Sequence, residues 1–388
     1  MSPAPGDLYI QVMVAGNESP LPDVPVIEME TLARWFTDRR PLTVLDVRPA
    51  PERAEWHIPG SLHVDAYDAL WARDPLALAS LSLPMDRPVV TVCGAGRTSL
   101  LAAAALASRG HEVYSLARGM RAWSVAWNSA TVASGAPSIQ QVRRAGKGCL
   151  SYIAVSRGEA LVIDPSLDAA VYQRLAEGLG ARIVHVLETH VHADHLSRAR
   201  SLASSTGAAL HLPAQERTRF PCHRLRDGDR VRFGDCGVTA LWTPGHTGES
   251  TCYLLEDQFL FTGDTLLGAG VGRPDLEGGP GEAAARARDL HRSLQRLLAC
   301  PGTTTILPGH TAEVVGFDGR PLCMTIDDAR TGNRLLSLGE AEFVPAIVGS
   351  IPPAPPRYAE IVRLNEQGIT PPGDPADLEA GANRCAVA

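Results

Sequence analysis

The sequence of 388 residues lacks several features that would place it in a specialised class of protein. No run of apolar residues approaches the length of a membrane span, and the apolar stretch 99–107 predicts a short helix at most. The formal net charge of −7 gives no reason to expect nucleic acid or an anionic membrane as a partner. Residues 1–6 contain neither a basic nor an apolar segment, so we expect no signal peptide for secretion.

Cysteine pairs of the Cys-x-x-Cys type are also absent, although the chain contains eight cysteines: Cys93, Cys149, Cys222, Cys236, Cys252, Cys300, Cys323 and Cys385. Scattered single cysteines fit a reducing compartment and leave room for one or two functional thiols. Hydrophobic residues at 45% and charged residues at 20% are the proportions of an ordinary globular protein. We therefore expect a cytoplasmic protein without structural disulfides.

The length predicts two domains, each large enough to bury its own core. After residue 25, strands alternate with helical stretches, which predicts a parallel α/β sheet. From about residue 139 the pattern changes, and two strand-like stretches separated by Arg157-Gly158 predict a hairpin. We divide the chain into a lead-in (1–24), a first domain (25–130), a linker (131–138), a second domain (139–370) and a poorly ordered tail (371–388).

The densest cluster of reactive side chains is Thr-His-Val-His-Ala-Asp-His at residues 189–195. It follows the stretch 182–188, whose β-branched residues predict a buried strand, and precedes the stretch 196–205, which has helix-like composition. Side chains on a turn between a strand and a helix can converge on one ion from several directions. The candidate metal ligands of this motif are His190, His192, Asp194 and His195.

Three further candidate ligands each follow a predicted strand. They are His246 in Thr-Pro-Gly-His-Thr, Asp264 in Thr-Gly-Asp-Thr and His310 in Leu-Pro-Gly-His-Thr. Small residues beside each of them allow the backbone to turn sharply and to approach an ion closely. Together with the motif at 190–195, they predict a metal centre.

This constellation resembles the metallo-β-lactamase superfamily over residues 139–370, which implies an αββα sandwich with metal at the edge where the strands end. The superfamily includes hydrolases with two zinc ions, such as glyoxalase II, and iron oxygenases. Residues 270–276, Gly-Val-Gly-Arg-Pro-Asp-Leu, resemble the Gly-Arg-Thr-Asp signature of persulfide dioxygenases, and residues 325–335 are similar to the stretch that follows the last histidine in that family.

The resemblance implies one Fe(II) per chain, held by His190, His246 and Asp264. A triad of two histidines and one carboxylate leaves one face of the ion open to a persulfide sulfur and O₂, whereas zinc is redox-inert. The other four residues would orient ligands, water and substrate, or would form a vacant second metal site: His192, Asp194, His195 and His310. Because all four are present, two zinc ions per chain are the alternative.

The sequence departs from the family pattern at two places. Pro274 replaces the usual Thr of the signature, and Thr311-Ala312 replaces an Asp-Tyr pair that often follows the last histidine. The second departure puts glutathione in doubt as the carrier of the persulfide. Arg273 is a candidate for binding a carboxylate of that carrier, with Asp275 beside it, although a structural pairing of Arg273 with Asp275 is the equal alternative.

Residues 93–99, Cys-Gly-Ala-Gly-Arg-Thr-Ser, form a second candidate site between a predicted strand (88–92) and a predicted helix (100–107). The helix N-terminus and backbone N–H groups of the loop would favour a thiolate, and then a persulfide, on Cys93. Arg97 would bind an oxyanion such as thiosulfate or sulfite. The other candidate substrate-binding residues of the loop are Gly94, Gly96 and Thr98.

Residues 25–130 resemble a single rhodanese domain. The matching segments are Asp46-Val-Arg48 with Glu52, His57-Ile-Pro-Gly60, the loop from Cys93 to Thr98, and Gly119-Met-x-x-Trp123. The resemblance implies that Cys93 carries a persulfide, and phosphatase loops in this fold are usually one residue longer. Cys149, in Gly-Cys-Leu-Ser-Tyr, is expected to be a core residue.

The hypothesis from the sequence is a persulfide dioxygenase fused to a thiosulfate sulfurtransferase, acting in sulfide oxidation. Its partners would be O₂, thiosulfate or sulfite, and the persulfide of glutathione, coenzyme A or cysteine. A zinc thioesterase of the glyoxalase II type with a sulfurtransferase domain is one alternative, and a non-catalytic sulfur carrier or sensor is another. The sequence leaves open the thiol carrier, the oligomeric state (a homodimer included) and the direction of sulfur flow.

Overall fold

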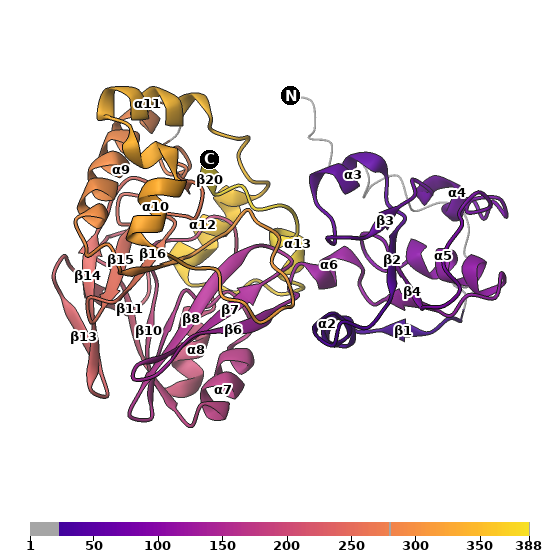
Figure 1. The fold of residues 1–388 in the computed structure, drawn as a ribbon, viewed down its shortest axis with the longest axis horizontal. Helices are drawn as coiled ribbons and strands as arrows, with labels where there is room; N and C mark the ends of the chain where they lie inside the picture. Colours follow the sequence, from indigo (N-terminus) through magenta and orange to yellow (C-terminus); the bar gives the residue numbers. More distant parts are fainter. Residues whose placement is uncertain (1–22, 279–280, 388) are drawn as a thin grey trace. The chain divides into compact units, whose positions relative to one another are not determined.

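The computed structural model describes residues 23–278 and 281–387 and divides the chain into two compact units (Figure 1). One unit contains Pro41–Ala54 and Gly60–Gly119 together with residues up to Glu28. The other contains Met29–Arg40, Glu55–Pro59 and the chain from Met120 onward. Both units are mixed α/β.

The first unit is built on a five-stranded parallel sheet with the order β1-β5-β4-β2-β3. Strands β2 (Thr43–Asp46) and β4 (Val89–Val92) are buried along their whole length, as expected for parallel strands covered on both faces. This confirms the predicted parallel α/β domain. The other elements are β1 (Val26–Ile27), β3 (Leu62–His63), β5 (Val113–Leu116), α3 (Ala50–Glu55), α4 (Tyr67–Trp71) and α5 (Thr98–Ala107).

The second unit contains two large sheets that pack face to face. Side chains from both sheets form one buried core, in which the rings of Tyr152 and Phe261 lie 5.1 Å apart between centroids. The seven-stranded sheet, in the order β12 to β6, contains β6 (Asn128–Ser134), β7 (Ser138–Arg144), β8 (Cys149–Ser156), β9 (Glu159–Ile163), β10 (Arg182–Leu187), β11 (Ala209–Pro213) and β12 (His223–Leu225). The six-stranded sheet contains β13 (Arg230–Phe233), β14 (Cys236–Trp242), β15 (Thr251–Leu255), β16 (Phe259–Gly263), β18 (Thr305–Pro308) and β19 (Met324–Thr325).

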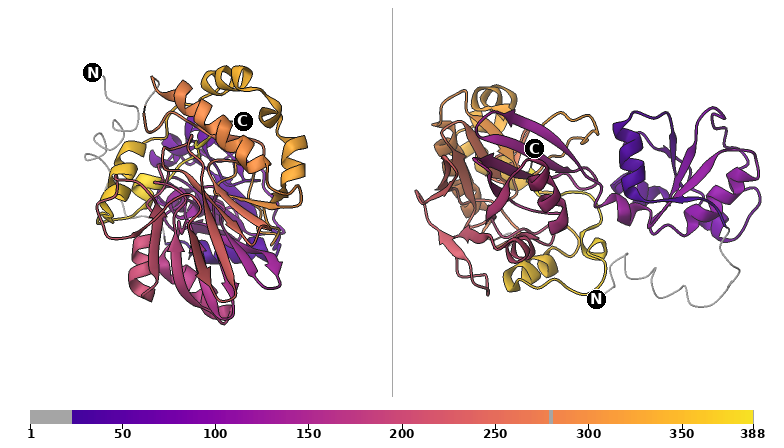
Figure 2. Two further views of the ribbon diagram at one scale, coloured as in Figure 1. Left: turned by 90° about the vertical axis from the view of Figure 1, so that its left-hand side faces the viewer. Right: turned by 90° about the horizontal axis from the view of Figure 1, so that it is seen from below.

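Helices cover the outer face of each sheet (Figure 2). The helices α7 (Ala169–Gly178) and α8 (Ala199–Thr206) pack their apolar sides against the seven-stranded sheet. On the six-stranded sheet lie α9 (Ala283–Leu298) and α11 (Glu340–Gly349). The predicted αββα sandwich is therefore confirmed. The remaining helices of this unit are α2 (Met29–Thr37), α6 (Met120–Trp123), α10 (Ile326–Gly332), a 3₁₀ turn (Arg334–Ser337), α12 (Tyr358–Gln367) and α13 (Ala376–Glu379).

The hairpin between β8 and β9 forms where the sequence predicts it. Its two turn residues, Arg157 and Gly158, both have positive φ angles, 50° and 75°. Two consecutive residues of this kind make a turn whose twist matches that of antiparallel strands. Cys149 lies at the opposite end of β8 from this turn, beside the predicted metal centre.

Two expectations from the sequence were wrong. The segment predicted as a linker, 131–138, belongs to β6 and the turn into β7, and β6 pairs with β7 along its length. The segment predicted as a poorly ordered tail contains α13 and a short strand, β20 (Ala386–Val387), which pairs with β17 (Val271–Gly272). Composition misled in both cases because small and polar residues suit an edge strand paired by backbone hydrogen bonds as well as they suit a loop.

Among the described residues, no helix has both the length and the apolar character needed to cross a membrane.

Candidate functional site

The loop that carries the His-x-His-x-Asp-His motif leaves the end of β10 and is fixed by buried hydrogen bonds at its start. Thr189 donates from its backbone N and its hydroxyl to the two oxygens of Asp164, at 2.7 and 2.8 Å. The same hydroxyl lies 2.9 Å from Nδ1 of His190. These contacts fix the rotamer of His190 and turn its Nε2 away from Thr189, toward Asp264.

His190, His246 and Asp264 converge in the interior at the edge of the sandwich. The Nε2 atoms of His190 and His246 lie 3.9 and 3.6 Å from Oδ2 of Asp264. His246 donates from Nδ1 to the carbonyl of Arg273 at 2.8 Å, which leaves the lone pair of Nε2 facing the carboxylate. Two imidazole nitrogens and one carboxylate oxygen therefore point at a common position.

Two properties of this triad fit a metal cation. Oδ2 of Asp264 is buried and accepts no hydrogen bond from any described residue, and an unpaired buried carboxylate oxygen is costly unless a cation is bound to it. Burial, reinforced by the neighbouring His192, His246 and His310, lowers the pKa of His190 well below its ordinary value. The His190 ring is therefore neutral, the form that binds metal.

His192 does not join this triad. Its Nε2 lies 2.7 Å from Oε2 of Glu188 and 3.4 Å from Oδ1 of Asp164. Burial lowers the pKa of His192, but the two carboxylates outweigh burial and raise it well above its ordinary value. The two carboxylates therefore favour the protonated form of His192, and the three residues form a cluster of their own.

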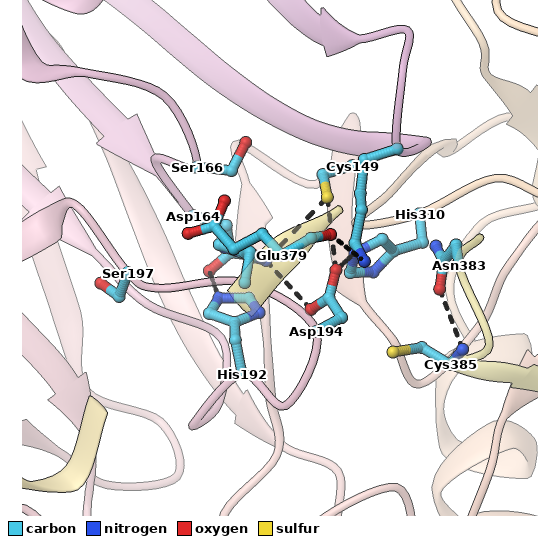
Figure 3. Close-up of polar contacts among 12 residues, drawn as sticks. Cys149, Asp164, Ser166, His192, Asp194, Ser197, His310, Glu379, Asn383 and Cys385 are labelled. Carbon is cyan, nitrogen blue, oxygen red and sulfur yellow. Dashed lines mark hydrogen bonds and ion pairs between the residues drawn. The ribbon is translucent and has the colours of Figure 1, made fainter. Parts of the chain in front are cut away.

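The other three residues of the predicted constellation, Asp194, His195 and His310, form a group with the sulfur of Cys149. Figure 3 shows Cys149 beside Asp194 and His310. Asp194 is the centre of the cluster. Its Oδ1 lies 3.0 Å from Nδ1 of His195, and its Oδ2 lies 2.9 Å from Nε2 of His310 and accepts from Cys149 Sγ at 3.3 Å. His310 also contacts Oδ1 of Asp264 through Nδ1, so its ring bridges the cluster and the triad.

The charges of this second cluster are strongly coupled. Burial and Asp194 raise the pKa of Cys149, but His310 and His195 outweigh them and bring it to about 7. Burial raises the pKa of Asp194, yet His310 and His195 lower it well below its ordinary value. Cys149 was predicted to be a core residue, and it is buried, but its thiol lies among three potential metal ligands rather than among apolar side chains alone.

The cysteine loop joins β4 to α5, as the sequence predicts. The sulfur of Cys93 is buried, accepts from the backbone N of Gly96 at 3.2 Å and lies 3.4 Å from the hydroxyl of Ser99. Gly96 has a φ of +83°, and a side chain there would come within 2.7 Å of the backbone of Arg118. Thr98 is buried at the first position of α5, so the loop curls its backbone around the sulfur.

Arg97 lies beside this loop, at the N-cap position of α5. Its guanidinium stacks over the ring of Trp71, 5.7 Å from the centroid. Gly94 lies beside Cys93, and a side chain added there would lie 4.0 Å from a carboxylate oxygen of Glu52. The roles of Arg97, Gly94, Gly96 and Thr98 in binding substrate stay predictions.

Comparison with known proteins identifies both halves of the chain. Residues 28–126 match the rhodanese-like domain family, and residues 144–310 match the metallo-beta-lactamase superfamily. The mitochondrial persulfide dioxygenase ETHE1 of Homo sapiens is 32% identical over 196 residues, which are 50% of this chain and 72% of that protein. ETHE1 of Mus musculus is 30% identical over 248 residues, which are 62% of this chain and 93% of that protein. The chain belongs to the ETHE1 persulfide dioxygenase family.

A solved structure of an ETHE1 protein, from Myxococcus xanthus, has the same fold as the second unit. It aligns with a TM-score of 0.52 and 29% identity, over 59% of this chain and 97% of that chain. Hydroxyacylglutathione hydrolases are also similar. The protein of Methylobacillus flagellatus is 37% identical over 155 residues, which are 39% of this chain and only 58% of the length of that hydrolase.

Arg273, in the segment 270–276 that resembles the persulfide dioxygenase signature, is buried. The guanidinium of Arg273 makes two hydrogen bonds to Asp275, at 2.7 and 2.9 Å, and donates to the carbonyls of Pro353 and Arg384 at 3.0 and 3.1 Å. Arg273 therefore pairs with Asp275, which was the alternative to binding a carboxylate of the substrate. Thr311, at the position of the family's Asp-Tyr pair, donates its backbone N–H to the carbonyl of Gly148.

Sequence reasoning missed two residues that hold the metal-binding loop of this ETHE1-family chain. Asn365, on α12, donates to the carbonyls of His192 and His195 at 2.9 Å each. Glu379, on α13, accepts from the backbone N of Leu196 at 3.0 Å. Both residues lie more than 150 positions from the loop in sequence, and no local pattern marks them. For Cys149 the local sequence signal is the glycine that precedes it. Gly148 has a φ of +84°, and a side chain there would lie 2.4 Å from the carbonyl oxygen of Thr311, so the position requires glycine.

Proposed function

We propose that the second unit is an iron-dependent persulfide dioxygenase, which oxidises the outer sulfur of a low-molecular-weight persulfide with O₂ and releases sulfite and the thiol. One observation carries the proposal: His190, His246 and Asp264 converge on a common position, while Nε2 of His192 lies against Glu188 and Asp164. This donor set of two histidines and one carboxylate suits Fe(II) with open coordination positions.

Bound iron would supply the redox chemistry with O₂ that zinc lacks. The surrounding residues would hold the three ligands in place and limit the access of water to the iron. The carbonyl of Arg273 fixes the ring of His246, the hydroxyl of Thr189 fixes that of His190, and His310 holds Oδ1 of Asp264. All three ligands are at least 97% buried, which limits the access of bulk water to the site.

For the first unit we propose sulfur transfer through a persulfide on Cys93. The N–H of Gly96 and the N-terminus of α5 would stabilise a thiolate and then the terminal sulfur of the persulfide. Sulfite would attack that terminal sulfur, break the S–S bond and leave as thiosulfate, with the electron pair of the broken bond returning to Cys93 as thiolate. Sulfite is also the product proposed for the second unit.

The carrier thiol of the persulfide would be glutathione, coenzyme A or cysteine. Thr311-Ala312 in place of the usual Asp-Tyr pair argues for comparing all three rather than assuming glutathione. Initial rates of O₂ uptake with each persulfide, at matched concentrations, would rank the carriers.

The second candidate function is a dinuclear zinc thioesterase, in which a metal-activated hydroxide attacks a thioester. The observation in its favour is the second cluster of Asp194, His195 and His310, together with the similarity to hydroxyacylglutathione hydrolases. This function requires two hydrolytic metal ions per chain and activity without O₂.

Asp264→Ala and His195→Ala separate the two functions. Asp264→Ala should abolish both iron binding and O₂ uptake because the triad loses a ligand and its negative charge. His195→Ala should retain most of the iron, since its Nδ1 lies in the other cluster. Metal analysis after anaerobic loading with Fe(II) measures both. If His195→Ala empties the site as completely as Asp264→Ala does, the mononuclear assignment is wrong.

A further inference from the structure

A small cavity lies beside the metal-binding loop of the second unit. It has a volume of about 20 Å³, and its surface is mostly apolar. Its wall includes His190, one of the three proposed metal ligands, and the neighbouring Val191. Leu210 and Leu212 of β11 and Ala199, the first residue of α8, contribute further apolar surface. The cavity therefore adjoins the triad on the side of the seven-stranded sheet that α8 covers.

A larger hollow of about 260 Å³ adjoins this cavity and shares part of its wall, including Ser197 and Asn365. Arg200 and Phe220 also line both spaces, and Arg200 is exposed to solvent. The guanidinium of Arg200 lies over the ring of Phe220, 5.5 Å from its centroid, and a side chain added at Gly368 would come within 2.5 Å of the same ring. The ring of Phe220 is thus held at the boundary between the inner cavity and the outer hollow.

The polar groups around the inner cavity are paired with one another. One carboxylate oxygen of Glu188 accepts from the hydroxyl of Ser197, and the other lies against Nε2 of His192. Asn365 donates to the carbonyls of His192 and His195 and accepts from the backbone N of Ser197. Of the buried side-chain nitrogen and oxygen atoms that these lining residues carry, the one without a partner in the described chain is Nδ1 of His192. A buried water needs two to four polar partners, so this cavity is unsuited to holding water.

Size limits the occupant further. A cavity needs about 10–15 Å³ to hold a molecule as small as water, so a volume of about 20 Å³ accepts one molecule of a few atoms. Pockets that enclose larger organic ligands have volumes of roughly 300–1,000 Å³, which excludes the carrier thiol of a persulfide. An apolar molecule of two atoms satisfies both the size and the lack of polar partners.

We propose that this cavity is a binding site for O₂, which enters through the outer hollow and passes Phe220 before it reaches the metal triad. An apolar gas partitions from water into apolar surroundings, so the cavity would hold O₂ beside His190. The inference rests on the proposed dioxygenase function, since a hydrolase does not consume O₂. It adds to that function a route for the gas.

The first measurement does not depend on activity. Dissolved O₂ is paramagnetic and increases the relaxation rates of methyl protons that it contacts. In the full chain loaded with zinc, which is diamagnetic, we expect O₂ to relax the methyl groups of Leu210 and Leu212 more strongly than those of Leu202. Leu202 is fully buried in the same apolar core but is not among the described residues that line the cavity. Equal relaxation at the three leucines, or nuclear Overhauser effects from a resident water to Leu212, would overturn the proposal.

Ala199→Val and Ala203→Val are the matched variants. Both add two methyl groups to a buried alanine of α8, but Ala203 lines a different hollow at the surface. Ala199→Val should fill the cavity and remove the additional relaxation at Leu212. With iron bound, it should raise the KM for O₂ by at least about threefold while kcat and iron content stay unchanged.

Ala203→Val should resemble the wild type in relaxation and in the KM for O₂. An absence of O₂ uptake by the wild type would contradict the proposed function, and the relaxation of Leu210 and Leu212 would still decide whether the cavity binds O₂. A KM for O₂ that rises equally in both variants, or in neither of them, would overturn the proposed route.

Discussion

The contact between His192 and Glu188 bears on whether one metal ion or two bind at this site. In a dinuclear site His192 would be a metal ligand, but its Nε2 lies 2.7 Å from a carboxylate oxygen of Glu188. Its remaining ring nitrogen, Nδ1, has no partner in the part of the chain that the structure describes. Nε2 of His192 is therefore engaged by a carboxylate, which leaves Nδ1 as the nitrogen through which His192 would bind a metal.

His192→Gln tests this contact. The amide of glutamine can still donate a hydrogen bond to Glu188 but cannot replace an imidazole as a metal ligand. We expect iron affinity to fall by less than about threefold, against the loss of 10–100-fold that follows removal of a supporting group from a metal site. Equilibrium titration with Fe(II) under anaerobic conditions gives the ratio. Complete loss of iron would place His192 among the ligands and contradict the triad.

His211 predicts a dependence of stability on pH. Its Nε2 lies 3.0 Å from Nδ1 of His185, and its ring stacks on His223. Burial, together with the charges of His185 and His223, lowers the pKa of His211 from 6.5 to about 4. Between these two values the unfolded chain binds a proton that the folded chain does not, so the free energy of unfolding should fall as the pH is lowered from about 6.5 to about 4.

After allowance for solvent screening, this loss should be of the order of 1–2 kcal/mol. His211→Gln cannot charge, and urea unfolding of the second unit at pH 5 and pH 7.5 should show a smaller difference in the variant than in the wild type. His291→Gln, a change in the same unit but on α9, should leave the difference as it is. An unchanged pH dependence in His211→Gln would show that other groups control it.

At the scale of secondary structure, the short strand β20 supports the metal centre from the other end of the chain. It pairs with β17, and the carbonyl of Cys385 accepts from the backbone N of Arg273 at 3.0 Å. The carbonyl of Arg273 in turn accepts from Nδ1 of His246. The orientation of one proposed metal ligand, His246, therefore depends on the last residues of the described chain.

Ending the chain after residue 382 should lower the affinity for iron by about 10–100-fold, because the peptide that orients His246 loses its paired strand. Titration with Fe(II) measures the affinity, and circular dichroism checks that the fold is retained. Cys385→Ala, which keeps the backbone pairing, is the control and should bind iron as the wild type does. Equal iron affinity in the truncated and full-length proteins would remove this role from β20.

The sequence predicted those elements whose local pattern and tertiary contacts agree. The hairpin at Arg157-Gly158, the strand before His190 and the helix after Cys93 all follow local rules of turn chemistry and periodicity. The linker and the tail were mispredicted because their structure comes from pairing with distant strands. Cys149 was missed for the same reason, since its partners lie 45 residues or more along the chain.

At the scale of the whole molecule, the two proposed activities handle the same sulfur. The second unit would release sulfite, and a persulfide on Cys93 would convert sulfite to thiosulfate. Each activity has its own residues, because Cys93 belongs to the first unit and the triad to the second. Loss of one activity should therefore leave the other intact and change only the proportions of sulfite and thiosulfate that are released.

Cys93→Ser tests this relation, since a hydroxyl hardly ionises near neutral pH and forms no persulfide. O₂ uptake with a free persulfide should survive, the product should shift from thiosulfate toward sulfite, and O₂ uptake driven by thiosulfate plus a thiol should vanish. O₂, sulfite and thiosulfate are measured together, with correction for the uncatalysed reaction of sulfite with persulfide. Unchanged product ratios would mean that sulfite released by the second unit does not react with the persulfide on Cys93.

The most direct test of the central claim is the O₂ consumption of protein loaded anaerobically with one Fe(II) per chain and supplied with the persulfides of glutathione, coenzyme A and cysteine. We expect uptake with at least one carrier, with one O₂ consumed for each sulfur released as sulfite or trapped as thiosulfate, and no uptake by Asp264→Ala. No uptake with any of the three persulfides, together with thioester hydrolysis by protein containing two zinc ions per chain, would contradict the account.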